Sequence, residues 1–100
     1  LIVFDEELTL EMISGELSAA VKSEFIERTI GPILAEKELM ETVQELFRQN
    51  HSLKRTAETL HIHINTLHYR LKKVEELTGL DSGNIHDLLC LYMAVLFLEE

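Results

Sequence analysis

The sequence predicts an all-α fold, an orthogonal bundle of about six helices that contains a helix-turn-helix, in a single domain over residues 1–100. Apolar residues recur at helical spacing in each segment, and the strict alternation typical of a β-strand is absent. Glycine, proline and asparagine fall between these periodic segments and separate them. A composition of 46% apolar and 27% charged residues is ordinary for a globular domain with its own core.

Two helices are expected before residue 31. The first runs from about residue 6 to residue 13 and stops at Ser14-Gly15. The second starts near Ser18, whose hydroxyl can cap it, and ends before Gly31-Pro32, where the chain carries a strong stop signal. The residues of this helix that we expect to face inward are Val21, Phe25 and Ile26.

A third helix is expected over about residues 35–49. Asn50 can end this helix, because asparagine tolerates the left-handed conformation found at many helix C-termini. Its apolar residues recur on one side: Leu39, Val43, Leu46 and Phe47.

A helix-turn-helix is predicted at residues 52–78. Ser52 can cap a short helix over residues 53–60, and three turn residues later His63 can cap a longer helix over residues 64–78. This arrangement of a short helix, a tight turn and a second helix is the one that DNA-binding helix-turn-helix units use.

The residue types around the turn suit that motif. Ala57 is small where two crossing helices must approach closely, and Leu60 and Ile62 can fill the angle between them. His61 stands at the start of the turn, where glycine is often found. It is expected to be left-handed, which histidine adopts more readily than most residues.

The last expected helix covers residues 85–98, after a stop at Gly79 and a cap at Asn84. It is apolar nearly all round, and it is too short to span a bilayer. Such a helix is either the central core helix or an oligomer interface, and the core role is favoured.

Placing residues 64–78 at about 100° per residue separates two faces of that helix. One face is apolar and should point to the core: Ile64, Leu67, Leu71 and Val74. The opposite face is polar and largely basic: Asn65, Thr66, Tyr69, Lys72, Lys73 and Glu76. An amide can bond adenine in the major groove, whereas lysine and tyrosine can hold phosphates. Arg55, on the shorter helix, is expected to reach the DNA backbone.

Charge is distributed unevenly along the chain. Residues 48–73 carry six basic side chains and one acidic side chain, a net charge of +5. The other 74 residues carry −14, which gives the chain its net charge of −9. Basic residues concentrated in this way are typical of a surface that binds a polyanion, with the acidic part held away from it.

The motif resembles a known family on three stretches: "TAETLHIHINTLHYRL", "VEELTGLD" and "DLLCLYMAVLFL". These are similar to the C-terminal helix-turn-helix domain of the PucR family of bacterial transcription regulators, especially its sugar-diacid regulator branch. The resemblance implies that Asn65, Thr66, Tyr69 and Arg70 lie in the recognition helix. The family usually has arginine just before "NTL", where this chain has Ile64.

We therefore expect sequence-specific binding of double-stranded DNA, with residues 64–78 in the major groove. Arg70 lies at the edge of the outer face, where it can brace the fold or touch a phosphate, and a mixed role is favoured. The candidate DNA-binding residues are Arg55, Asn65, Thr66, His68, Tyr69, Arg70, Lys72 and Lys73.

The expected partners follow from that function. One motif covers a half-site, so a homodimer with its two motifs roughly 34 Å apart is expected. The chain lacks an initiating Met, which suggests a fragment of a longer cytoplasmic regulator whose missing N-terminal region binds a small-molecule effector. No metal, cofactor or membrane contact is expected.

Rival functions have less support. His63 and His68 are five residues apart, about 140° around a helix, which does not suit a shared metal. The sequence has no glycine-rich phosphate loop and no nucleophile motif, so an enzyme is not favoured. The thiol of Cys90 has no basic neighbour in the sequence to activate it. A protein-interaction module without DNA contact stays open as the alternative, and it would bind without the steep salt dependence of DNA binding.

Overall fold

The computed structural model describes residues 6–100, and side chains from residue 9 onward. Within this range the fold is all-α, as predicted, with six α-helices and one 3-10 turn. In chain order they are α1 (Glu6–Gly15), α2 (Ala19–Ile30), η1 (Gly31–Ile33), α3 (Lys37–Arg48), α4 (Leu53–Leu60), α5 (Ile64–Thr78) and α6 (Ile85–Glu99).

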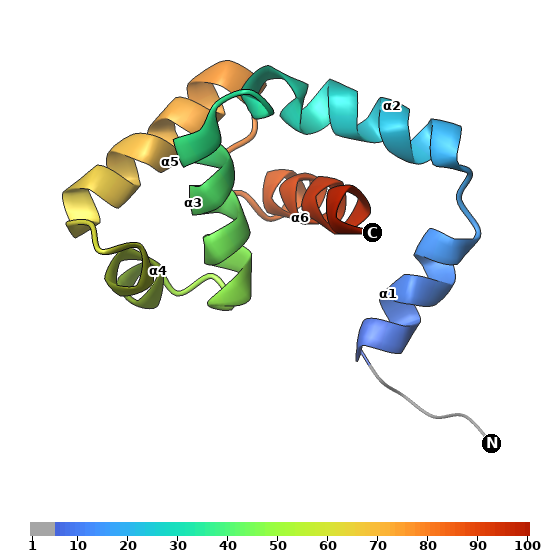
Figure 1. Cartoon of the computed structure of the whole chain (residues 1–100), viewed down its shortest axis with the longest axis horizontal. Coiled ribbons are helices and arrows are strands. Elements are labelled where there is room, and N and C mark those ends of the chain that lie inside the picture. The colour runs from blue at the N-terminus through green and yellow to red at the C-terminus, as the bar shows by residue number, and fades with distance from the viewer. Residues whose placement is uncertain (1–5) are drawn as a thin grey trace.

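The helices gather around α3 and α6. Figure 1 shows α6 in the middle of the molecule, with α2 passing over it and α4 and α5 together at one end. α2 packs along α6, while α3 packs against α4, α5 and α6. The main core cluster comes from α2, η1, α3, α5 and α6. Its buried residues are Ile30, Ile33, Leu39, Met40, Val43, Val74, Leu91, Ala94 and Val95.

Most helix boundaries agree with the predicted ones because the caps are encoded locally. Ser18, Ser52 and Asn84 each accept a hydrogen bond from a backbone N–H of the first turn. Gly79 ends α5 in the left-handed conformation at φ 77°. The third helix differs: it begins at Lys37 and not near residue 35, because the chain first makes the 3-10 turn η1 with its proline near the start.

One expected core residue is exposed. Val21 was predicted to face inward, but half of its surface is accessible to solvent. The reason lies in how α2 meets α6: Lys22 pairs with Glu100 at 3.0 Å, and the Phe25 ring packs edge-on against Phe97. α2 thus contacts the end of α6 through Lys22 and Phe25, and Val21 is left exposed.

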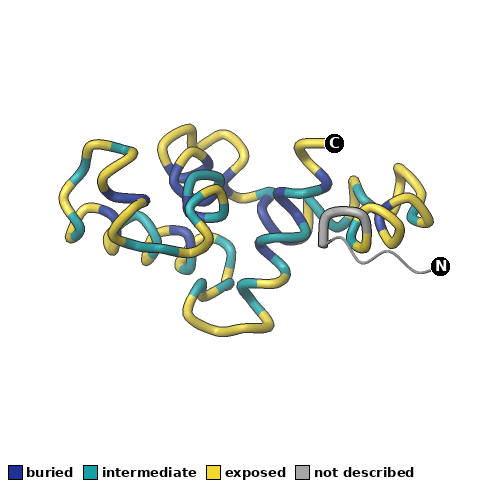
Figure 2. Tube along the Cα trace, turned by 90° about the horizontal axis from the view of Figure 1, so that it is seen from below, coloured by how far each residue is buried: buried dark blue, intermediate teal, exposed yellow. Residues whose placement is uncertain are grey.

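α6 is buried on one face and exposed on the other. Leu91, Ala94, Val95 and Phe97 are buried, which confirms the favoured core role of this helix. Ile85 and Leu89, in its first half, are 85% and 56% exposed. Figure 2 shows the alternation of buried and exposed segments along the chain.

None of the helices in residues 6–100 is both long and apolar enough to cross a membrane.

Candidate nucleic-acid interface

Two histidines set the turn between α4 and α5. His61 ends α4 in the left-handed conformation, at φ 57°. His63 caps α5, since its Nδ1 accepts a hydrogen bond from the backbone N–H of Asn65 at 3.0 Å. The predicted turn and cap roles of these histidines are confirmed, and both occupy positions fixed by the backbone of the motif.

The inner side of the motif is anchored by small and branched side chains. Ala57, Leu67 and Val74 are 6%, 0% and 1% exposed, so α4 and the middle of α5 are held against the core. Ile64 and Leu71, from the same predicted apolar face, are only half-buried. The firmest anchors of α5 are thus Leu67 and Val74.

The outer side of α5 carries the polar residues predicted to meet DNA. Tyr69 is 67% exposed, although it is an aromatic residue. The exposed members of the set on this helix are Asn65, Thr66, His68, Tyr69, Lys72 and Lys73. The structure therefore brings six of the eight predicted residues onto the exposed surface of one helix. His68, a candidate DNA-binding residue, belongs to this exposed group.

The two lysines of α5 are loosely paired with glutamates of the same helix. Lys72 Nζ lies 3.9 Å from Glu75, and Lys73 Nζ lies 3.8 Å from Glu76. Exposed pairs of this kind contribute only about 0–1 kcal/mol. A phosphate oxygen can replace either carboxylate at little cost, so both ammonium groups stay available to a polyanion.

α4 adds two further cations beside this face. Lys54 and Arg55 are exposed and form no ion pair with any side chain from residue 9 to residue 100. Arg48, by contrast, lies 3.4 Å from Glu45 and 3.8 Å from Glu99. Among the basic residues of the stretch 48–73, those without an ion pair therefore lie on α4.

Arg70 differs from the other predicted residues because it turns away from solvent. Only 17% of its side chain is exposed, and its guanidinium packs against α3. There Nη1 donates to the Thr42 hydroxyl at 3.4 Å, and Nη2 lies 3.7 Å from a carboxylate oxygen of Glu38. Of its two expected roles, the contacts show the bracing one.

Shallow hollows flank α5 on both sides. The one toward α3 has a volume of about 390 Å³, and Thr66, Tyr69 and Lys73 contribute to its wall. The one toward α4 and the loop before α6 has a volume of about 270 Å³, and it takes in His68 and Lys72. Two groups of predicted residues on α5 thus border different hollows: Thr66, Tyr69, Arg70 and Lys73 on the side of α3, and His68 and Lys72 on the side of α4.

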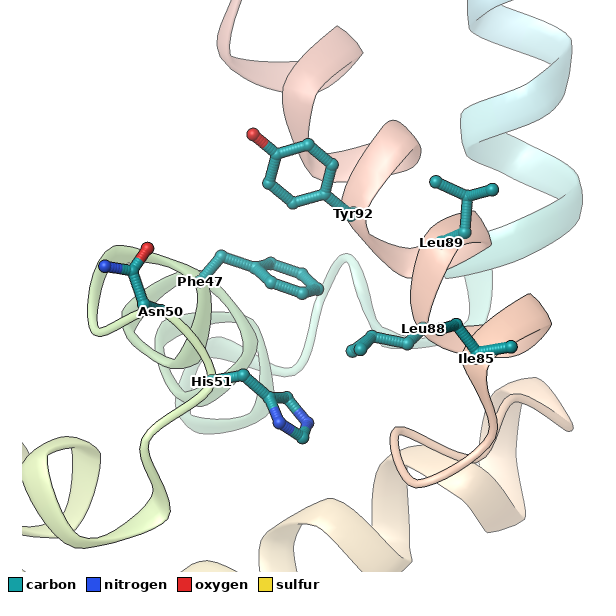
Figure 3. A pocket seen from close by; sticks show the side chains of 7 residues that line it. All are labelled: Phe47, Asn50, His51, Ile85, Leu88, Leu89 and Tyr92. Atoms are coloured by element: carbon teal, nitrogen blue, oxygen red, sulfur yellow. The ribbon is translucent and has the colours of Figure 1, made fainter. Parts of the chain in front are cut away.

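A third hollow is apolar and lies away from α5. Figure 3 shows the side chains of Phe47, Leu88 and Tyr92 around it, with Ile85 and Leu89 beside them on α6. Its volume is about 350 Å³. Exposed apolar patches often mark contacts with other proteins. This hollow is therefore the surface to which the alternative function, a protein-interaction module, would assign the contact.

His51 has a structural role that the sequence reasoning missed. It is left-handed at φ 66°, directly after the left-handed Asn50 that was predicted. Its Nε2 lies 3.2 Å from the carbonyl oxygen of Ser82, which connects the loop before α4 to the loop before α6. The contact spans 31 residues of sequence, so no local pattern could reveal it.

Two carboxylates have a lowered pKa, and both lie away from the outer face of α5. The backbone N–H of Asp81 donates to Asp87, and this bond together with His86 lowers the Asp87 pKa. The Ser14 hydroxyl and the Lys22 ammonium likewise lower the Glu100 pKa. These groups connect helix ends, so their titration bears on the fold.

The part of the chain that the structure describes contains no cluster of three or more His, Cys, Asp or Glu side chains able to hold a metal. Cys90 is a free thiol and is half-buried on α6.

Comparison with known proteins gives one family match. Residues 39–97 match the family described as the PucR C-terminal helix-turn-helix domain. That range begins in α3 and includes the whole of α4 and α5 and most of α6. No solved structure matches the chain.

Several curated proteins are similar to the chain. The Bacillus subtilis protein YsfB is 45% identical over 98% of the chain, which spans 27% of that protein. The Escherichia coli carbohydrate diacid regulator is 48% identical over 62% of the chain, or 16% of the regulator. The B. subtilis proline-responsive transcriptional activator PutR is 33% identical over 63% of the chain. The chain thus spans about a quarter or less of these longer relatives.

Proposed function

The chain belongs to the family of PucR C-terminal helix-turn-helix domains, DNA-binding domains of transcription regulators, and from this premise we propose that it recognises a specific DNA sequence by inserting α5 into the major groove. The observation that supports this most is the exposed polar ridge of α5. It lies opposite the face that Leu67 and Val74 anchor in the core, so the packing of α5 holds the polar face toward solvent.

The first turn of α5 is proposed to read the bases. Asn65 and Thr66 lie there and are exposed. In helix-turn-helix proteins the N-terminal residues of the second helix approach the base edges. An asparagine amide can bond N6 and N7 of adenine together, so Asn65 is the residue that we propose to discriminate between bases.

Cations on both helices are proposed to hold the phosphates. Lys72 and Lys73 of α5 and Arg55 of α4 supply the charges, and the Tyr69 hydroxyl supplies a further hydrogen bond. Such contacts fix the register of the protein on the duplex without reading its sequence. His68 lies near Lys72 on the flank toward α4, where we propose that it also borders the DNA.

Fluorescence anisotropy across a salt series tests this proposal. The probe is a duplex that the protein enriches from a randomised library, compared with a scrambled duplex. Affinity is expected to fall steeply with salt, by a slope of roughly 0.9 per phosphate contacted, and to remain higher for the enriched duplex. Failure to enrich any duplex would refute sequence specificity, and binding that does not respond to salt would favour the interaction module.

We further propose that the DNA-bound form is a homodimer. A second copy is a suitable occupant of the apolar surface of α6, because this surface, formed by Ile85, Leu89 and the hollow in Figure 3, is free of acidic side chains on a chain of charge −9. Sedimentation equilibrium of the wild type and Ile85→Asp checks this. The wild type is expected to dimerise and the variant to be monomeric, whereas identical behaviour would place the contact elsewhere.

For a longer protein like the relatives, we propose that a small-molecule effector binds in a region N-terminal to this domain. The names of two relatives refer to carbohydrate diacids and to proline. Limited proteolysis of such a longer form with and without candidate effectors is the test, and protection within residues 6–100 alone would contradict it.

A further inference from the structure

Arg70 makes the one direct polar side-chain link between α3 and α5 among the described residues. Its Nη1 donates to Thr42 Oγ1 at 3.4 Å, and its Nη2 lies 3.7 Å from Glu38 Oε2. Glu38 and Thr42 are one helical turn apart on α3. The guanidinium therefore contacts α3 at two successive turns.

The acceptor on α3 is held in a fixed direction. Thr42 is completely buried, and its hydroxyl donates to the backbone carbonyl of Glu38 at 2.7 Å. Because the hydroxyl proton is used in this bond, the oxygen is left with its lone pairs to accept from Arg70. The hydroxyls of Thr29 and Thr56 also donate to a backbone carbonyl of the preceding turn. Within residues 9–100, however, neither hydroxyl accepts a hydrogen bond from a side chain of another helix.

The remaining contact between the two helices is apolar. Leu39 and Val43 of α3 and Val74 of α5 belong to one core cluster. Apolar packing is not directional, so it fixes which face of α5 is buried but tolerates a small rotation of the helix about its axis. A planar guanidinium with its donors in a rigid fork supplies that missing direction.

We infer that Arg70 is a positioning residue, which sets the rotation of α5 so that Asn65 and Thr66 meet the base edges. This inference rests on the proposed function. Arg70 borders the hollow between α3 and α5 together with Thr66, Tyr69 and Lys73, but it is much less exposed than Tyr69. A small rotation of α5 would leave the phosphates within reach of long lysine side chains and would displace the shorter side chain of Asn65.

Thr42→Val tests the inference without touching the interface. The substitution keeps the shape of the side chain, removes the acceptor and changes no charge, and residue 42 is fully buried and cannot contact DNA. The ratio of affinities for the library-enriched duplex and the same duplex with one preferred base pair exchanged is expected to fall about tenfold. The salt slope should not change, because no phosphate contact is lost.

Two further variants separate positioning from phosphate binding. Arg70→Lys keeps the charge and loses the fork, so a positioning role predicts the same loss of base discrimination, whereas a simple phosphate contact predicts nearly wild-type behaviour. Thr42→Ser keeps the hydroxyl and should keep discrimination. Full discrimination in both Thr42→Val and Arg70→Lys would overturn the inference.

A measurement on the free protein keeps the two proposals distinguishable. In Thr42→Val, relative to Thr42→Ser, the backbone amide resonances of Asn65 and Thr66 are expected to shift. If they shift while the wild type prefers no DNA sequence, positioning by Arg70 stands and the proposed function fails. If they do not move, the inference is refuted whatever the DNA result. Thermal unfolding followed by circular dichroism confirms that each variant is folded at the temperature used.

Discussion

α5 and α6 are helices of equal length, each with 15 residues, yet they present opposite surfaces to solvent. The exposed side of α5 carries an amide, hydroxyls and ammonium groups, whereas the exposed side of α6 begins with Ile85 and Leu89. Both helices bury their other side in the same core. Burial explains one face of each helix, and the chemistry of the other face supports the partners proposed above: a polyanion for α5 and an apolar protein surface for α6.

The largest expected effect concerns the buried side of α5. Leu67 is 0% exposed, so Leu67→Ala removes fully packed methyl groups and leaves a cavity. Unfolding in urea is expected to show a loss of about 2–5 kcal/mol. The matched control is Leu98→Ala at the end of α6, outside the proposed dimer contact, where the residue is 38% exposed and the expected change is about 0.5 kcal/mol. Equal losses in the two variants would mean that the two positions are equally buried in solution.

The next effect concerns the outer face of α5. Asn65→Ala should lower discrimination at one base pair by about 1–3 kcal/mol, because the bidentate bond to that base is lost. Competition binding against duplexes substituted at each position measures this. Cys90→Ser on α6 is the control and should leave the profile unchanged. If Asn65→Ala weakens binding to all duplexes equally, this residue does not read bases.

Ile64 offers a gain of function at the start of the same helix. It is half-buried where the family usually has arginine, so Ile64→Arg should add one phosphate contact. We expect the salt slope to steepen by about 0.9, and Lys73→Gln to make it shallower by a similar amount. An unchanged slope for Ile64→Arg, measured by anisotropy across the salt series, would show that residue 64 does not reach the DNA backbone.

The smallest effect concerns the start of α6. Hydrogen bonding from the Asp81 backbone lowers the pKa of Asp87, so the ionised group stabilises the fold above the unfolded pKa, at about 3.9. That stabilisation is lost as the pH falls through the lower folded value. The urea midpoint of the wild type should therefore exceed that of Asp87→Asn at about pH 6, and the difference should shrink below about pH 4. Glu58→Gln on α4 is the control, and a difference that does not change with pH would contradict this account.

Features encoded by neighbouring residues were predictable from the sequence. The limits of α4 and α5 follow from Ser52, His63 and Gly79, which act within one helical turn. The alternation of core and outer residues on α5 follows from helical spacing in the same way. The exposed ridge of α5 was therefore predicted together with its supporting face.

Features that depend on distant segments were not predictable. Val21 has the spacing of a core residue, but its exposure depends on how α2 packs against α6, which is distant in the sequence. Arg70 lies at the edge of the outer face by helical angle, and only the position of Thr42, 28 residues away, shows that it turns inward. The contact of His51 with Ser82 likewise depends on how two loops meet.

Mapping the DNA contact on the protein by NMR tests the contrast between α5 and α6 most directly. Backbone amide shifts are followed while the library-enriched duplex is added to the labelled wild type. The account predicts the largest changes at Asn65, Thr66 and Tyr69 and at Lys54 and Arg55 of α4, with changes on the exposed face of α6 that do not exceed those caused by dimerisation alone. Changes concentrated at Ile85 and Leu89, with the first turn of α5 unaffected, would contradict it.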